Sequence, residues 1–137
     1  MSVFVEFDES GRPLVTATFS NQKLTPELFN NYLKGVEQLW EKDERYLLIL
    51  DMRNIRVPKY RYIRQQANWL KQHEAEILTY CRGITCVVNR PLIRYLVRLV
   101  FMLQASPVHY VVYSNMQEAV QNAKISLGLN QAQEVEL

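Results

Sequence analysis

The sequence predicts an α/β fold: a single mixed, mostly parallel five-stranded sheet covered by about four helices. Strand-like stretches, with alternating or continuous apolar residues, are interspersed with stretches whose apolar residues recur at helical spacing. Their order is ββαβαβαβα, and repeated β-α-β units need crossovers that make neighbouring strands parallel. The 137 residues fit one domain. We place it at residues 1–128 and assign 129–137 to a polar tail.

The strands differ in their apolar pattern. Residues 3–7 and 14–19 alternate apolar and polar side chains on either side of a turn, which predicts a hairpin. The continuous runs 46–50 and 84–88 are typical of central strands covered on both faces. Residues 108–113, rich in β-branched and aromatic side chains, predict the last strand.

Residue signals mark the boundaries of the first and last of the four helices. Thr25 can cap a helix that begins at Pro26, and Ser114 or Asn115 can cap the last one, which Gly128 ends. A second helix is predicted over residues 60–78. Its apolar stripe is Ile63, Ala67, Leu70 and Ile77.

The third helix, from Pro91 to about Gln104, is apolar nearly all round except for its arginines. Arg90, Arg94 and Arg98 form one stripe. The side chains expected to cover the sheet are Leu92, Tyr95, Leu96, Leu99 and Leu103. The other apolar side chains of this helix, which are not needed to cover the sheet, are Ile93, Val97, Val100 and Phe101. Such a helix suits a membrane interface or a partner groove; it also suits burial between the sheet and a second helix, or a homodimer contact.

Charge is distributed unevenly along the chain. Residues 1–51 hold five Lys/Arg and nine Asp/Glu, whereas residues 52–117 hold ten Lys/Arg and only Glu74 and Glu76. A block this basic attracts anions such as phosphorylated proteins, acidic lipids or nucleotides. A solvated arginine surface would have the same composition.

Four basic residues fall where such an anion would bind. Arg53, Arg56 and Lys59 follow the predicted strand 46–50, and Arg90 follows the strand 84–88. Parallel sheets bind ligands beyond the carboxyl ends of their strands, and helix N-termini there favour anions. We therefore expect an anion-accepting rim, unless these side chains are only solvated or pair with Asp51.

Four segments resemble the SpoIIAA-like subgroup of the STAS superfamily, small α/β domains related to anti-sigma factor antagonists. They are YLLILDMRNI, QQANWL, GITCVVN and VHYVVYSNMQEAVQ. In the last, Glu118-Ala119 matches the early Glu-Ala pair of the family's terminal helix. The resemblance spans most of residues 3–127 and implies a non-catalytic regulatory, ligand-binding or membrane-associating module.

The chain departs from the antagonist pattern at one place. In antagonists, a strand ending in Asp-Leu leads to an Asp-Ser-Ser/Thr-Gly turn that is phosphorylated. Here residues 53–61 contain no Ser or Thr. The phosphoswitch is therefore not expected, and a serine-kinase partner is not carried over.

The sequence contains few motifs that indicate an enzyme, a metal site or a nucleic-acid-binding protein. No G-x-G-x-x-G, Walker A, G-x-S-x-G or H-E-x-x-H motif occurs, so no enzyme, metal site or cofactor is predicted. Cys81 and Cys86 lack C-x-x-C spacing, and we expect Cys86 to be a buried thiol. His73 is expected to face solvent. Although aromatic residues lie in the basic block, no recognition helix or RNA-binding signature indicates nucleic acid.

The sequence therefore favours a non-catalytic regulatory or protein-interaction module. Its expected contact residues are Arg53, Arg56, Lys59, Arg90, Arg94, Arg98 and Phe101. The alternative is binding of a lipid or other anionic amphiphile, with the head group on the arginines and peripheral membrane association. The absence of signal-peptide features at the start predicts a cytoplasmic protein.

Overall fold

The computed structural model describes residues 3–128, and the predicted tail lies outside them. The five strands lie in chain order across one sheet. They are β1 (Val5–Asp8), β2 (Leu14–Phe19), β3 (Tyr46–Asp51), β4 (Cys81–Val87) and β5 (Tyr110–Tyr113). β1 and β2 form the predicted antiparallel hairpin, and all other neighbours are parallel. The predicted mixed, mostly parallel sheet is confirmed.

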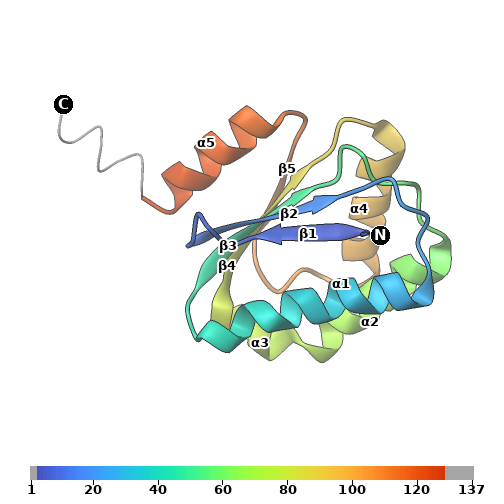
Figure 1. Cartoon of the computed structure of the whole chain (residues 1–137), viewed down its shortest axis with the longest axis horizontal. Coiled ribbons are helices and arrows are strands. Elements are labelled where there is room, and N and C mark those ends of the chain that lie inside the picture. The colour runs from blue at the N-terminus through green and yellow to red at the C-terminus, as the bar shows by residue number, and fades with distance from the viewer. Residues whose placement is uncertain (1–2, 129–137) are drawn as a thin grey trace.

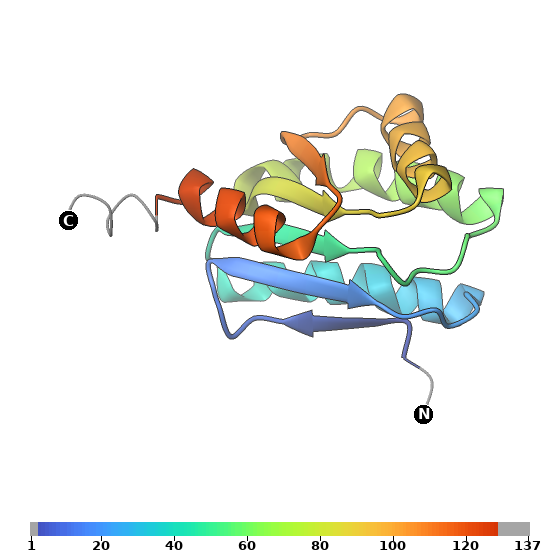
Figure 2. The same ribbon diagram turned by 90° about the horizontal axis from the view of Figure 1, so that it is seen from above.

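The helices are unequally divided between the two faces of the sheet. Four connect parallel strands: α1 (Pro26–Gln38), α2 (Tyr60–Gln72), α3 (Glu74–Tyr80) and α4 (Pro91–Leu103). Each crossover leads to the next strand in the same direction, and right-handed crossovers then place every connecting helix on one face. α5 (Met116–Ser126) follows the last strand and packs on the opposite face (Figures 1 and 2).

The two faces carry cores of different size. The larger core lies between the sheet and α1–α4. On the other face Leu47, Ile49 and Val87 contact α5, where Ala119 and Ala123 allow the helix to approach closely. Because β3 contributes to both cores, its continuous apolar run is buried on both sides, as the sequence predicts.

Local signals placed the helix starts correctly. The Thr25 hydroxyl accepts the backbone N–H of Leu28 at 3.2 Å, and Asn115 accepts that of Glu118 at 2.7 Å. The 3-10 turn Leu39–Lys42, which follows α1, was not predicted. The predicted helix 60–78 is instead two helices, because the backbone of His73 departs from helical geometry between α2 and α3. The last strand begins at Tyr110 rather than at Val108.

The predicted orientation of α4 is only partly right: Leu96 and Leu99, expected on the sheet, are half-buried and pack against the large core. The buried residues of α4 are Ile93, Val97 and Val100, which were predicted to lie away from the sheet. Leu92, Tyr95 and Leu103, expected on the sheet, are exposed. Apolar residues surround this helix, so periodicity alone could not distinguish its two sides.

The carboxyl end of β3 is fixed by an ion pair. Asp51 is buried and accepts the backbone N–H of Arg53 as well as its Nε and Nη2, at 3.2, 2.9 and 2.8 Å. Hydrogen bonds from the Arg53 side chain lower the pKa of the Asp51 carboxyl. The pair orders the turn that follows the strand.

The orientation of α4 is tested by two substitutions on its opposite sides. Ile93→Ala removes a core side chain and is expected to lower the free energy of unfolding by about 2–5 kcal/mol. Leu92→Ala removes a solvent-exposed one and is expected to change it by no more than about 0.5 kcal/mol. Urea denaturation measures both, and a larger loss for Leu92→Ala would restore the orientation predicted from sequence.

The Asp51–Arg53 pair predicts a specific pH dependence of stability. A carboxyl with a lowered pKa stabilises the fold above its unfolded pKa, and this contribution is lost as pH falls through the folded value. Asp51→Asn should lower the free energy of unfolding at pH 7 by about 1–2 kcal/mol, since hydrogen bonds to a charged group are lost next to a partly exposed arginine. The difference from wild type should shrink below about pH 4, near the ordinary Asp pKa. The matched control is the exposed Glu44→Gln; a pH-independent difference for Asp51→Asn would contradict the ionic role.

Candidate functional site

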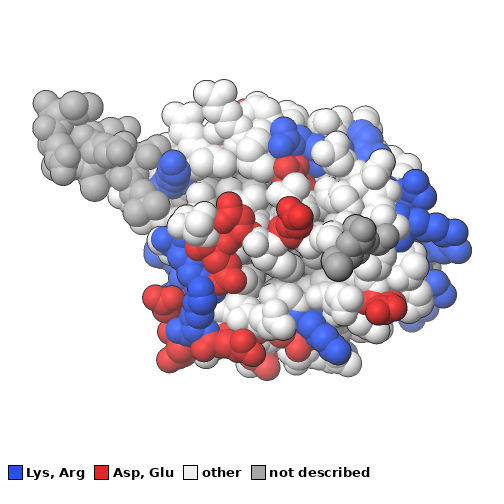
Figure 3. Space-filling view, viewed as in Figure 1, with Lys and Arg blue, Asp and Glu red and all other residues white. Residues whose placement is uncertain are grey.

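Three strands end at one edge of the molecule, and their following loops form a shallow depression there. β2 contributes Ser20 and Asn21, the loop after β3 contributes residues 53–57, and the loop after β4 contributes Arg90. Figure 3 shows Lys and Arg side chains gathered along this edge, whereas acidic and basic side chains lie side by side at the other end. The topology thus brings Arg53, Arg56 and Arg90 together, as expected for an anion-accepting rim.

The three arginines are not equally available to a ligand. Arg53 is already bound by Asp51. The Nη2 of Arg90 donates to the carbonyl oxygen of Ile55, and its Nε is buried with no partner among residues 3–128. Arg56 and Lys59 are exposed and make no ion pair within the described chain. Since Asp51 cancels one charge, the net positive charge of the depression comes from Arg56 and Arg90.

The remaining predicted contact residues lie outside the depression. Arg94 and Arg98 are exposed on α4, one and two turns beyond Arg90. Phe101 turns inward, and its ring stacks on Tyr110 with the ring centroids 4.2 Å apart. The expected stripe of arginines is therefore divided: Arg90 is anchored at the rim, while the other two face solvent.

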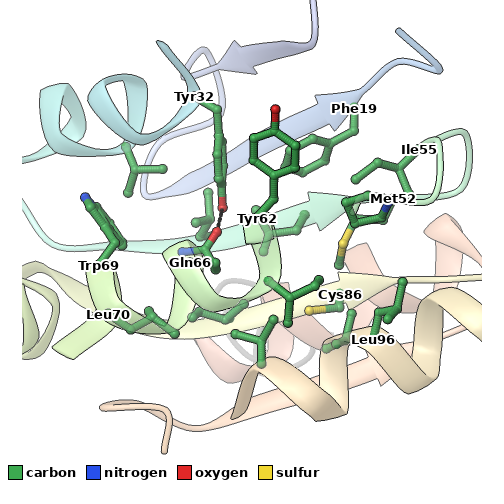
Figure 4. Close-up of a pocket in the computed structure, with 18 of the residues that line it drawn as sticks. Phe19, Tyr32, Met52, Ile55, Tyr62, Gln66, Trp69, Leu70, Cys86 and Leu96 are labelled. Atoms are coloured by element: carbon green, nitrogen blue, oxygen red, sulfur yellow. Dashed lines mark hydrogen bonds between the residues drawn. The ribbon is translucent and has the colours of Figure 1, made fainter. Parts of the chain in front are cut away.

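A second feature, absent from the sequence analysis, is an apolar cavity between the sheet and α1, α2 and α4. Its volume is about 150 Å³. Figure 4 shows side chains converging on it from both the sheet and the helices, among them Phe19, Tyr32, Met52, Trp69, Cys86 and Leu96. An apolar cavity of about this size in another protein stays dry and binds benzene.

The polar atoms around the cavity are already engaged. The Tyr32 hydroxyl donates to Gln66 Oε1 at 2.8 Å (Figure 4), and the Tyr62 hydroxyl accepts Nη2 of Arg61 at 2.9 Å. The indole N–H of Trp69 donates to Glu37 at 2.9 Å. An apolar group is therefore the ligand chemistry that the interior suits best, since a polar one would find few free partners.

Ile55 joins the two features. It lines both the cavity and the basic depression, and its carbonyl is held by Arg90. Met52, the first residue after β3, also lines the cavity, and Arg53 next to it lines the depression. The short loop after β3 thus forms part of the wall of both the cavity and the depression.

The cysteines do not supply nucleophiles. Burial raises the pKa of the Cys86 thiol to about 12 and that of Cys81 to about 11. Both thiols are therefore protonated at neutral pH and behave as small apolar groups, as expected for Cys86.

His73 is the centre of an aromatic cluster, and the expectation that it faces solvent is wrong. Its ring lies 5.0 Å from Trp69 and 5.5 Å from Trp40. Carboxylate oxygens of Glu37 and Glu76 each lie 3.7 Å from one of its nitrogens. The cluster joins α1, the turn after it, α2 and α3, so its evident role is to hold these helices together.

The described residues hold neither a metal-binding cluster nor a membrane-spanning helix. Among residues 3–128, no group of three or more His, Cys, Asp or Glu side chains is placed to hold a metal ion. No helix in that range is long and apolar enough to cross a membrane.

Comparison with known proteins supports the fold. No protein-family model and no curated protein matches the sequence. The structure is similar to the crystal structure of an uncharacterized protein of the DUF3478 family, described as having a SpoIIAA-like fold, from Shewanella loihica PV-4. The TM-score is 0.62 at 9% sequence identity, over 87% of this chain and 91% of that one. The chain thus has the SpoIIAA-like fold that its sequence motifs indicated.

Proposed function

We propose that the protein is a non-catalytic binding module for an anionic amphiphile. The depression at the strand ends holds the anionic group, and the cavity beneath α4 takes the apolar group. The observation that supports this best is the position of Ile55 in the wall of both. The protonated thiols and the occupied Asp51 carboxylate agree with a binding role rather than a catalytic one.

The geometry also indicates the size of the ligand. A cavity of about 150 Å³ takes a group about as large as benzene without rearrangement. The anionic group would meet Arg56 and Arg90, and α4 begins directly after Arg90 with free backbone N–H groups in its first turn. We place this activity in the cytoplasm.

Affinity for alkyl phosphates should depend on chain length in two stages. Each added methylene should strengthen binding about fourfold while it enters the cavity, since burial of one CH₂ contributes roughly 0.8 kcal/mol. Beyond the length that fills the cavity, affinity should level off. Titration calorimetry with a series from methyl to decyl phosphate measures the dependence, and Trp69 in the cavity wall provides an independent fluorescence signal.

Two variants separate the two halves of this site. Arg56→Ala should weaken every member of the series by a similar factor, because it acts on the phosphate. Leu96→Trp, or the smaller change Leu96→Phe if the first fails to fold, should remove the dependence on chain length. The control is Arg82→Ala, an exposed arginine in β4. Equal affinity for methyl and decyl phosphate in the wild-type protein would refute the proposal.

A regulatory protein-interaction role, which the sequence favoured, is the second candidate function. It is supported by Arg56 in the depression and by Lys59 near it in the chain, which are exposed and form no ion pair with any described residue. Its partner would present an acidic surface, because these groups bind anions.

This second candidate predicts that charge reversal abolishes a specific complex. A binding protein retained by the wild-type chain should be lost with the Arg56→Glu/Lys59→Glu double variant and kept with Arg82→Glu. Affinity purification followed by mass spectrometry makes the comparison. Equal retention by both variants would exclude this surface as the contact.

A further inference from the structure

Helices α2 and α4 pack against each other on the same face of the sheet (Figure 2), and both expose arginines. Arg61 and Arg64 are exposed on α2, and Arg94 and Arg98 are exposed on α4. None of the four forms an ion pair with any residue in 3–128. Neither helix contains an Asp or a Glu. Every charged side chain of this helix pair is therefore positive.

The positive ends of both helix dipoles lie at one edge of the molecule. α2 and α4 follow β3 and β4, whose carboxyl ends meet at the same edge because the two strands are parallel neighbours. The residues at the helix starts, Lys59 and Arg90, make no side-chain capping hydrogen bond, and neither first turn contains an acidic residue. The free backbone N–H groups there therefore add to the positive charge of the arginines.

Two tyrosine rings are exposed on the same two helices. Tyr60, the first residue of α2, is 55% exposed, and Tyr95 on α4 is 58% exposed. Neither ring pairs with another aromatic ring of the described chain. Each ring has an arginine directly after or before it in the sequence, Arg61 and Arg94. An exposed aromatic ring near basic side chains gives a nucleobase a surface on which to stack.

The distribution of the charges indicates a ligand with repeated anionic groups. Arg61 and Lys71, both exposed on α2, are ten positions apart, which is about 15 Å along the helix, and exposed arginines continue on α4. A small anion would contact one or two of these cations, whereas a nucleic acid supplies a phosphate for each. An acidic peptide also carries repeated charge, but it offers the tyrosine rings no base. Because a duplex keeps its bases stacked inside, the exposed rings favour a single strand.

We propose that this surface binds single-stranded nucleic acid. The α2–α4 surface consists of Tyr60, Arg61, Arg64, Arg94, Tyr95 and Arg98. Its arginines and the two helix N-termini bind phosphates, and its tyrosine rings stack on bases. No linear motif indicated this function, because the surface combines two helices that are far apart in the sequence. The proposal goes beyond the amphiphile site, since none of the six residues lines the cavity or the depression.

Fluorescence anisotropy with labelled oligonucleotides tests the proposal. Oligo-U and oligo-dT of about 12 nucleotides compare RNA with DNA, and a DNA duplex of the same length is the third probe. The wild-type protein should bind a single strand at least about tenfold more tightly than the duplex, whose bases cannot reach the rings. A preference for oligo-U or for oligo-dT then identifies the ligand as RNA or as DNA.

The charge contribution is tested by salt dependence. Wild-type affinity for the single strand should fall with a slope of about −3 in a plot of log K against log salt concentration, since four arginines contact phosphates at roughly 0.7 per contact. Arg64→Gln/Arg98→Gln should make this slope shallower by about 1.4. The matched control is Arg82→Gln/Lys124→Gln, which removes two exposed cations from β4 and α5 and should leave the slope unchanged.

The stacking contribution is tested on the two tyrosines. Tyr60→Leu/Tyr95→Leu should weaken binding of the single strand at least about tenfold, because leucine keeps an apolar side chain but has no flat ring. Tyr60→Phe/Tyr95→Phe should bind as the wild type does, because phenylalanine keeps the ring. Both variants should retain wild-type affinity for butyl phosphate, so the result does not depend on the amphiphile site.

Several results would overturn the proposal. Circular dichroism first checks that each variant is folded. The wild-type protein should not fail to bind both single strands, nor bind the duplex equally well, and the folded leucine variant should not match the phenylalanine variant. If polyglutamate competes as well as unlabelled oligo-U does, the surface attracts any polyanion and is not a nucleic-acid site.

Discussion

The right-handed crossovers between neighbouring parallel strands determine on which face of the sheet the helices lie and at which edge the loops meet. Strands β2 to β5 follow one another across the sheet in chain order, so each connection must cross the same face. Among residues 3–128, that face receives α1–α4, and the other receives only α5. The same constraint brings the loops after β2, β3 and β4 to one edge, which is why residues distant in sequence form the basic depression.

The packing of α1–α4 on one face of the sheet accounts for the cavity. It also accounts for the two sides of α4, of which one is buried and the other exposed. Aromatic side chains from β2, α1 and α2 meet beneath α4 without filling the space between them. A void of about 150 Å³ is worth roughly 3–4 kcal/mol of lost stability at the slope measured for engineered cavities. That is a large part of the 5–15 kcal/mol that typically stabilises a domain. A bound apolar group would recover much of it, which agrees with a binding role.

The parts of the fold that were predictable from sequence are those decided by local chemistry. The buried strand β3 and the caps Thr25 and Asn115 depend on residues close together in the chain. The side of α4 that faces the core was not predictable, because its apolar residues allow more than one orientation and neighbouring helices choose between them. The cavity left no signal, since a gap between ring side chains depends on their relative angles. His73 was misplaced for the same reason: its two indole neighbours come from Trp40 and Trp69, of which only Trp69 is near in sequence.

Arginines at this edge differ in role according to whether a carboxylate lies within reach. Arg53 has Asp51 two residues before it, so its charge is used to order a turn. Arg90 has no such neighbour and binds the carbonyl oxygen of Ile55, so no carboxylate among residues 3–128 compensates its charge. Arg94 and Arg98 lie in a segment of 41 residues, 77–117, without a single acidic side chain, and remain exposed. The total charge of the basic block therefore overstates how much positive charge the rim offers to an anion. It also understates how much positive charge α4 offers. On α4 these exposed arginines lie beside exposed apolar side chains, among them Leu92, Tyr95 and Met102, so charge and apolar surface occur together on this helix.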